Sequence, residues 1–255
     1  MKRLLTALIL IPSVIYVIFL GPSLLFQAVV AAMAFFCFRE YGGIAQAQQI
    51  PVNIWLGQAF GLLFLFAPRA EWLVLVAMAM IVATLAMRLD NLAQSLPSAS
   101  ALLFGLIYIY GAWRCAVVLH AASAWWLFFA VSINWVGDSA ALYSGKLFGK
   151  HKLAPVVSPK KTWEGAIGSA LFSTLYGVVL LAKGVPQTPM LHAAALSFLA
   201  CAAGQIGDLA ESAMKRGAGI KDSGHMLPGH GGWLDRLDST LFSMPVVAVY
   251  LYLVQ

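Results

Sequence analysis

Long apolar runs make up most of the chain, and short polar or Pro/Gly segments separate them. Most runs approach the roughly 20 residues that a membrane-spanning helix needs. Lipid offers no partner to open backbone groups, and the alternation of a membrane barrel is absent, so we expect helices. The predicted spans are Leu4–Leu20, Ser23–Phe38, Val52–Ala67, Trp72–Met87, Ala101–Leu119, Ala124–Leu147, Ala166–Ala182, Met190–Leu209 and Ser239–Val254.

The predicted fold class is therefore all-α, a polytopic integral membrane protein with about nine transmembrane helices. Val52–Ala67 and Ser239–Val254 are short enough to be half embedded, which leaves counts of about eight or ten open. We expect one membrane domain over residues 1–255. Residues 1–120 supply N-terminal helices, and 121–255 hold the helices and loops that carry the chemistry.

Composition agrees with this class, because 61% of the residues are hydrophobic and 10% are charged, where a soluble domain has about 25% charged. The first run follows Lys2 and Arg3 and could be taken for a signal peptide. Its apolar core exceeds the usual ~7–15 residues and has no clear cleavage site. We expect a first transmembrane helix, kinked or broken near Pro12.

The basic residues predict an orientation. With the N-terminus in the cytoplasm, only Arg69, Arg114 and Lys183 of the 16 lysines and arginines fall toward the other side. The positive-inside rule favours this arrangement. Two polar loops, Gly145–Gly165 and Ser212–Asp238, then share the cytoplasmic face. The cations expected on that face are Lys2, Arg3, Arg39, Arg88, Lys146, Lys150, Lys152, Lys160, Lys161, Lys215, Arg216, Lys221 and Arg236.

The three cysteines carry little information about function. Cys37, Cys115 and Cys201 each lie within an apolar run. Their spacing fits neither a zinc site nor a disulfide framework, so we expect small buried residues.

Two carboxylates are predicted at membrane depth, Asp138 inside one span and Asp208 at the inner end of another. Ionisable groups there are expensive, so they usually face the bundle interior and function there. The alternative is a helix-end aspartate that caps a helix or reaches the interface. Asn134, Asp138 and Ser139 fall on nearly one helical face, which favours a polar interior stripe.

Asp235 and Asp238 stand three residues apart at the start of the last span, so both project from one face of a helix. Adjacent carboxylates repel unless a cation lies between them, and oxygen ligands suit Mg2+. Asp208 enters the same layer and favours a metal. The alternative is that Lys215, Arg216 or Arg236 neutralises them as ion pairs.

The loop Gly145–Gly165 carries five lysines and places Ser158 to Lys161 just before a helix. A helix start offers free N–H groups to a phosphate, and lysines add charge. An ordinary basic loop attracted to anionic lipid would also explain the lysines, although not the order SPKKTWEG.

The glycine cluster Pro228–Gly232 allows a close approach of the backbone to a ligand. A tight turn between helices is the alternative. His230 within it could donate to a phosphate, act as an acid or base, or support another group.

These residues resemble the phosphatidate cytidylyltransferases, the CDP-diacylglycerol synthases. The resemblance extends upstream to DSAALYSGKLFGKHKLAPVVSPKKTWEG and GDLAES and covers the C-terminal half closely, whereas the N-terminal spans match only in kind. Trp233 departs from the pattern, which has an aliphatic residue there. The signature positions are Ser212, Lys215, Arg216, Lys221, Asp222, Gly224, Leu227, Pro228, His230, Gly231, Gly232, Asp235, Arg236, Leu237 and Asp238.

The resemblance implies condensation of phosphatidate with CTP to CDP-diacylglycerol and pyrophosphate, with Mg2+ required. Such transfer depends on positioning and electrostatics, which metal-binding carboxylates and cations provide. We expect Asp208 and Asp235 to hold the metal, with Asp238 sharing it and Asp138 completing the ion site. Phosphate-binding roles fall to Lys160, Lys161, Lys215, Arg216 and Lys221, while Ser158 and His230 line the site.

The expected partners are these two substrates and membrane lipids, with no nucleic acid, in a bacterial inner membrane with the site facing the cytoplasm. The oligomeric state stays open, with a homodimer among the alternatives. Two other functions are alternatives. A membrane phosphotransferase of the CDP-alcohol type has a different aspartate spacing, and a transporter would show repeat symmetry between its halves.

Overall fold

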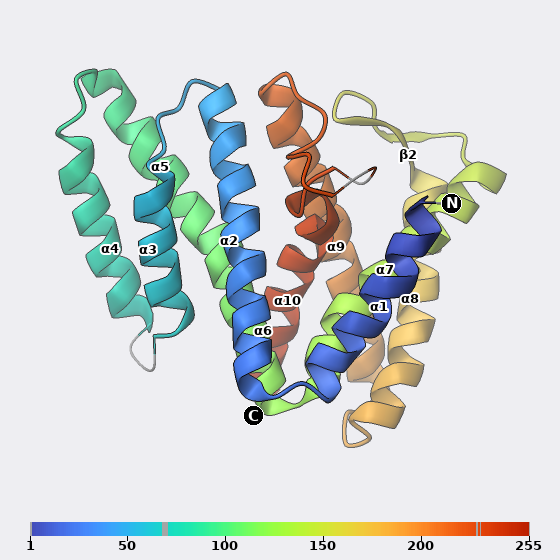
Figure 1. Cartoon of the computed structure of the whole chain (residues 1–255). Helices are drawn as coiled ribbons and strands as arrows, with labels where there is room; N and C mark the ends of the chain where they lie inside the picture. The colour runs from blue at the N-terminus through green and yellow to red at the C-terminus, as the bar shows by residue number, and fades with distance from the viewer. Residues whose placement is uncertain (1, 68–70, 228, 230, 255) are drawn as a thin grey trace.

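The computed structural model describes residues 2–67, 71–227, 229 and 231–254, and helices account for most of them (Figure 1). Two short strands form the exception, an antiparallel hairpin of β1 (Lys152–Ala154) and β2 (Ser158–Thr162). The helices are α1 (Lys2–Phe19), α2 (Ser23–Ala47), α3 (Ile54–Leu65), α4 (Glu71–Ala86), η1 (Leu92–Gln94), α5 (Ser95–Gly105), η2 (Leu106–Gly111), α6 (Ala112–Ala122), α7 (Ala124–Phe148), α8 (Trp163–Gly184), α9 (Met190–Gly217) and α10 (Leu234–Val254).

The predicted all-α class is confirmed, since every predicted span overlaps a helix. The count of nine spans is not, because among the described residues only five helices are long and apolar enough to cross a membrane alone. One of these is the continuous stretch Leu92–Ala122, in which η2 is a π-helical segment between α5 and α6. Helix α1 is continuous through Pro12, so the helix is not broken there.

Several helices run farther than their apolar stretches predicted. Helix α2 continues to Ala47, and α9 continues to Gly217, so Ser212, Lys215 and Arg216 are helical and not in a loop. Helical backbone hydrogen bonds form equally well beyond the apolar layer, whereas a hydrophobicity pattern reports only burial depth. Charged side chains are therefore held on rigid helix ends.

Small residues bring the helices of the C-terminal half together. A side chain at Gly137 of α7 would lie 2.9 Å from the hydroxyl of Ser169 on α8, and one at Gly207 of α9 would lie 2.6 Å from the carbonyl oxygen of Asp238 on α10. Such contacts are typical of helices that pack in membranes. Close packing of α7, α8, α9 and α10 fixes the frame in which the polar residues stand.

An aromatic cluster fills the N-terminal half around η2. Tyr110 is fully buried, and its hydroxyl donates to the amide oxygen of Gln58. Its ring packs 5.6 Å from that of Phe38, centroid to centroid, and lies directly against Gly61 of α3. The pairing satisfies two polar groups that the apolar interior would otherwise leave without partners.

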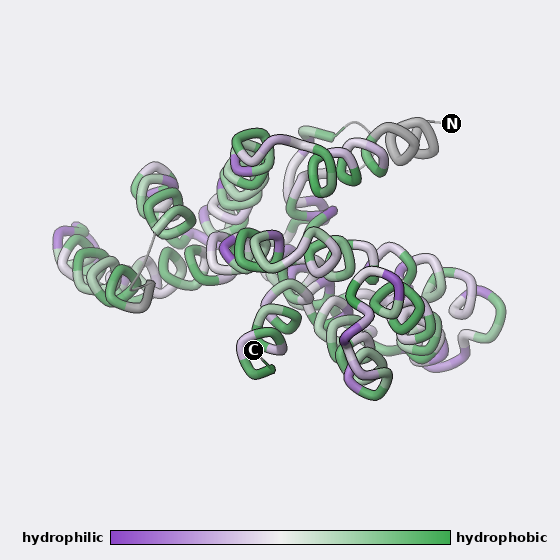
Figure 2. Tube along the Cα trace, turned by 90° about the horizontal axis from the view of Figure 1, so that it is seen from below, coloured by the Kyte–Doolittle hydropathy of each residue, from purple (hydrophilic) through white to green (hydrophobic). Residues whose placement is uncertain are grey.

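Hydrophobic residues predominate along the helices, as the hydropathy colours of Figure 2 show, and many large apolar side chains are exposed. Leu24, Trp55 and Leu191 are each at least 77% exposed. Exposed apolar side chains on long apolar helices suit lipid, so the chain is an integral membrane protein.

The polar segments gather at one end of the bundle. In Figure 1 the hairpin, the C-terminal ends of α2 and α9 and the start of α10 all lie toward the top. The expectation that the two polar loops share one face is confirmed.

The contact between Gly61 and Tyr110 predicts intolerance to one methyl group. We expect Gly61→Ala to lower the free energy of unfolding in detergent by about 1–3 kcal/mol, the usual effect of overpacking a core. The ring cannot retreat, because its hydroxyl is bonded to Gln58. Thermal unfolding of the purified protein measures the change.

Gly43→Ala is the matched control, because Gly43 is also helical but has no atom within 4 Å of the added carbon. It should be neutral or stabilise by about 0.5–1 kcal/mol through helix propensity. Equal melting temperatures for the two variants would contradict the packing described for Gly61.

Candidate active site

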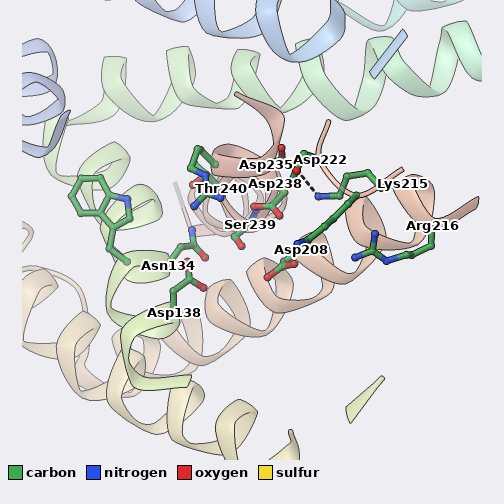
Figure 3. Close-up of a pocket in the computed structure, with 13 residues that line it drawn as sticks. Asn134, Asp138, Asp208, Lys215, Arg216, Asp222, Asp235, Asp238, Ser239 and Thr240 are labelled. Carbon is green, nitrogen blue, oxygen red and sulfur yellow. Dashed lines mark hydrogen bonds and ion pairs between the residues drawn. The ribbon is translucent and has the colours of Figure 1, made fainter. Parts of the chain in front are cut away.

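A cavity of about 320 Å3 lies at the polar end between α7, α9 and α10 (Figure 3). Carboxylates, amides and cations line it, and most come from positions singled out in the sequence. The lining residues are Asn134, Trp135, Asp138, Asp208, Lys215, Arg216, Lys221, Asp222, Asp235, Arg236, Asp238, Ser239 and Thr240.

Helix α9 supplies its polar side chains at helical spacing. Asp208, Glu211 and Lys215 stand three and four residues apart, which places them along one face. Ser212 shares this turn, and its hydroxyl donates to Asp208 over 3.4 Å. The face is directed at α10 and the cavity, as the close-up shows for Asp208 and Lys215.

Asp235 closes the loop between α9 and α10. Its Oδ2 accepts hydrogen bonds from the backbone N–H groups of Ser223 at 2.9 Å and Gly232 at 2.7 Å. Gly231 has φ +78°, and a side chain there would collide with the Asp235 carboxylate. Glycine is therefore required at this point of the turn.

Lys215 occupies the position between two carboxylates. Its Nζ lies 2.5 Å from Oδ1 of Asp235 and also contacts Glu211. The Lys215 side chain is 9% exposed, and that of Glu211 is fully buried. The structure thus contains the alternative in which a lysine neutralises Asp235. Glu211 is a second partner of this lysine, which the sequence did not indicate.

One of the two adjacent lysines of the hairpin contacts Asp208, a residue that lines the cavity. Nζ of Lys161 lies 2.6 Å from Oδ2 of Asp208, which joins β2 to α9. Neighbouring strand residues point to opposite faces, and Lys160 is exposed. Ser158 pairs with Ala154 in the hairpin and is not part of the cavity lining. The structure therefore separates Lys160 and Lys161, which the sequence treated alike.

Helix α7 contributes Asn134, which is buried as predicted, and Asp138, which lines the cavity although its side chain is exposed. The Asn134 amide donates to the carbonyl oxygen of Ala130 at 3.0 Å and to the hydroxyl of Ser243 at 2.8 Å, which orients it. The prediction for Ser139 is wrong. Its hydroxyl bonds the carbonyl oxygen of Trp135, and its side chain is exposed outside the cavity, because 100° per residue turns it away from Asp138.

Asp238 is 8% exposed, and its Oδ1 accepts from the N–H of Ser239 at 2.7 Å. The nearby carboxylates of Asp208, Glu211 and Asp138 repel its negative charge. In the part of the chain that the structure describes, no three His, Cys, Asp or Glu side chains converge closely enough to hold a metal. Oxygen donors nevertheless line one cavity.

Three more cations, from α9, the following loop and α10, complete the lining. Arg216 donates from Nη1 to the carbonyl oxygen of Ile220 at 2.9 Å, and Lys221 follows with an exposed side chain. Arg236 lines the same cavity from α10. His230, proposed as an acid, base or donor, lies outside the described residues.

Glu40 is the residue that sequence reasoning missed most clearly. It stands on α2, far from the C-terminal motif, yet its carboxylate is 7% exposed and contacts the loop before α10. A glutamate next to an apolar run, in FCFREYGG, was the available signal. Trp233, the departure from the family pattern, stacks on Phe36 of the same helix with centroids 6.1 Å apart.

Comparison with known proteins agrees with this site. Three relatives named phosphatidate cytidylyltransferase are similar over part of their length. The protein of Staphylococcus saprophyticus is 40% identical over 126 residues, 49% of this chain and 48% of the relative. Those of Staphylococcus epidermidis and Bacillus subtilis are 43% identical over 126 residues and 42% over 120 residues, which are 48% and 45% of the relatives.

The chain thus spans about half the length of the curated relatives that it matches. The sequence profile described as "Cytidylyltransferase family" extends much farther and matches residues 1–254. That match includes α2 as well as the helices that line the cavity. The chain belongs to the cytidylyltransferase family.

Proposed function

We propose that this protein is a phosphatidate cytidylyltransferase, which condenses CTP with phosphatidate to give CDP-diacylglycerol and pyrophosphate. The observation that carries the proposal is one cavity at the end of an apolar bundle, lined by both carboxylates and cations. Family membership and the names of the relatives support it. A site of this kind can meet a lipid from the bilayer and a nucleotide from water.

In the proposed reaction an oxygen of the lipid phosphate attacks the α-phosphorus of CTP. One phosphorus–oxygen bond forms, the bond to the β-phosphate oxygen breaks, and pyrophosphate leaves. No side chain need act as a covalent nucleophile, because the substrate phosphate already is one. The protein has to align two anionic reactants and offset their charge.

Lysines that now pair with carboxylates are well placed for this task. Lys161 pairs with Asp208, and Lys215 pairs with Asp235. Both ammonium groups carry further N–H donors, so phosphates can share or take over these contacts. We assign Lys161 to the nucleotide and Arg216, at the end of α9, to the lipid phosphate.

The cavity also suits Mg2+, which prefers oxygen ligands and keeps some of its water. Asp208, Asp235 and Asp238 would hold it, with Asp138 reaching in from α7. Asp235 accepts three hydrogen bonds, and a carboxylate has about four lone-pair positions, so one is left for an ion. When bound, Mg2+ offsets charge on the transferred phosphate.

We further propose that the site faces the cytoplasm of a bacterial inner membrane, where CTP is available. Basic residues collect at the end that holds the hairpin and the cavity, as the positive-inside rule expects of a cytoplasmic face. A lipid would then enter the cavity sideways, from the inner leaflet.

The function is tested directly with purified protein in phosphatidate-containing micelles. We expect cytidine incorporation from CTP, released pyrophosphate, and loss of both in EDTA until Mg2+ is restored. Asp208→Asn should reduce turnover at least ~10-fold, by analogy with losses of metal-site partners. This change is cleaner than one at Asp235, which also holds the loop through backbone N–H groups.

Asp90→Asn serves as the control for Asp208, because Asp90 is exposed and does not line the cavity. It should keep normal turnover. Full activity in EDTA would remove the metal assignment, and equal incorporation from all nucleotides would contradict selection of CTP.

The separation of the two hairpin lysines gives a second prediction. Lys161→Met should raise KM for CTP about 10-fold or more, because a charged hydrogen-bond donor to the phosphates is lost. Lys160→Met, next in the chain but on the exposed face, should change KM less than about 2-fold. Steady-state kinetics measure both, and equal effects would show that Lys161 has no special position.

Orientation is tested with cysteines in a background that lacks Cys37, Cys115 and Cys201. Val156 is 90% exposed at the hairpin, and Gln187 is exposed between α8 and α9 at the opposite end. We expect Val156→Cys to react with an impermeant thiol reagent only in inverted vesicles, and Gln187→Cys only in intact cells. The reverse pattern would overturn the proposed orientation.

A further inference from the structure

Glu40 of α2 touches the loop that precedes α10 but does not line the cavity. We propose that Glu40 is a positioning residue, which holds this loop so that Asp235 stays at the cavity. The inference rests on the proposed function for the meaning of the site. Its structural part, the hold on the loop, can be tested separately.

Three hydrogen bonds join the Glu40 carboxylate to the loop. Oε2 accepts from the hydroxyl of Ser223 at 2.8 Å and from the N–H of Leu234 at 2.8 Å. Oε1 accepts from the N–H of Trp233 at 3.0 Å. Glu40 is 7% exposed. A buried carboxylate that accepts three hydrogen bonds is strongly anchored.

The two backbone donors stand at the start of α10, since Leu234 is its first residue and Trp233 directly precedes it. The first N–H groups of a helix lack acceptors within it, and negative charge is favoured at that end. The chain normally supplies such a cap from a neighbouring residue. Here the cap for Leu234 comes from a different helix, 194 positions earlier in the sequence.

Glu40 and Asp235 hold the same segment from two sides. Ser223 donates its hydroxyl to Glu40 and its backbone N–H to Asp235. Gly232 donates to Asp235, and the next residue donates to Glu40. Because both carboxylates share the loop, release of one frees backbone groups that orient the other.

The loop is shaped to a carboxylate at this position. A side chain added at Gly224 would lie 2.6 Å from Oε1 of Glu40, so the backbone approaches closely. A glutamine has one acceptor oxygen and an NH2 group that is a donor. In Glu40→Gln the NH2 would therefore face an N–H or hydroxyl donor, and at least one backbone N–H would lose its partner.

The test uses the full chain with Glu40→Gln and Glu40→Asp, compared by steady-state kinetics and by hydrogen exchange of the amides at 223 and 232–234. We expect Glu40→Gln to lower kcat at least ~10-fold, since small displacements of reacting groups have such effects. KM for phosphatidate should stay within about 2-fold, and the loop amides should exchange faster. Glu40→Asp, which keeps the charge, should recover part of kcat and of the protection.

Gln48→Ala is the matched control. Gln48 also joins α2 to α9, through a 2.9 Å bond from its amide to the carbonyl oxygen of Met214, but it does not touch the loop. It should leave kcat and loop exchange unchanged. Melting temperatures of all variants distinguish a local effect from general unfolding.

Unchanged loop exchange in Glu40→Gln would overturn the proposal, and so would a loss of kcat that Gln48→Ala reproduces. Faster loop exchange with wild-type kcat would also overturn it, because the hold would then not serve the site. If the unaltered protein lacked cytidylyl transfer, the proposed function would fail. The exchange data would still decide whether Glu40 holds the loop.

Discussion

Charge balance around Lys215 is the constraint on which the polar end of the bundle depends. The side chain is 9% exposed and stands between Glu211 and Asp235, which are 0% and 5% exposed. Removing Lys215 would leave two buried carboxylates without their cation, which is strongly destabilising. Lys215 therefore joins α9 to α10 at this depth through Asp235, and the loop between these helices begins and ends next to this pair.

Hydrogen bonds, and not apolar packing, hold the loop between α9 and α10 in place. Asp235 collects N–H groups of Ser223 and Gly232, and Glu40 collects those at the start of α10. Helices α2, α9 and α10 thus act together on one segment. Helix α2 belongs to residues 1–120, yet its Glu40 contacts the loop next to the cavity, which the expected division did not foresee.

The helices and the cavity carboxylates could be predicted from the sequence, because apolar runs report burial and an aspartate at membrane depth needs a polar surrounding. Asp138 and Asp208 follow from this reasoning. The ends of α2 and α9 do not, since hydropathy falls where the helix leaves the apolar layer but the backbone continues. The roles of Glu40 and Glu211 could not be predicted either, because their partners come from tertiary contacts that no local pattern encodes. The different positions of Lys160 and Lys161 depend on a strand, where a loop was expected.

The two lysine–carboxylate pairs differ in their exposure to water. Salt therefore weakens one of them more than the other. Lys161 and Asp208 are 28% and 30% exposed, so mobile ions reach and screen their attraction. The pair at Lys215 is sheltered from such screening. The hairpin is consequently held at the rim by a force that weakens as ionic strength rises, whereas the base of the cavity keeps its geometry in the same solution.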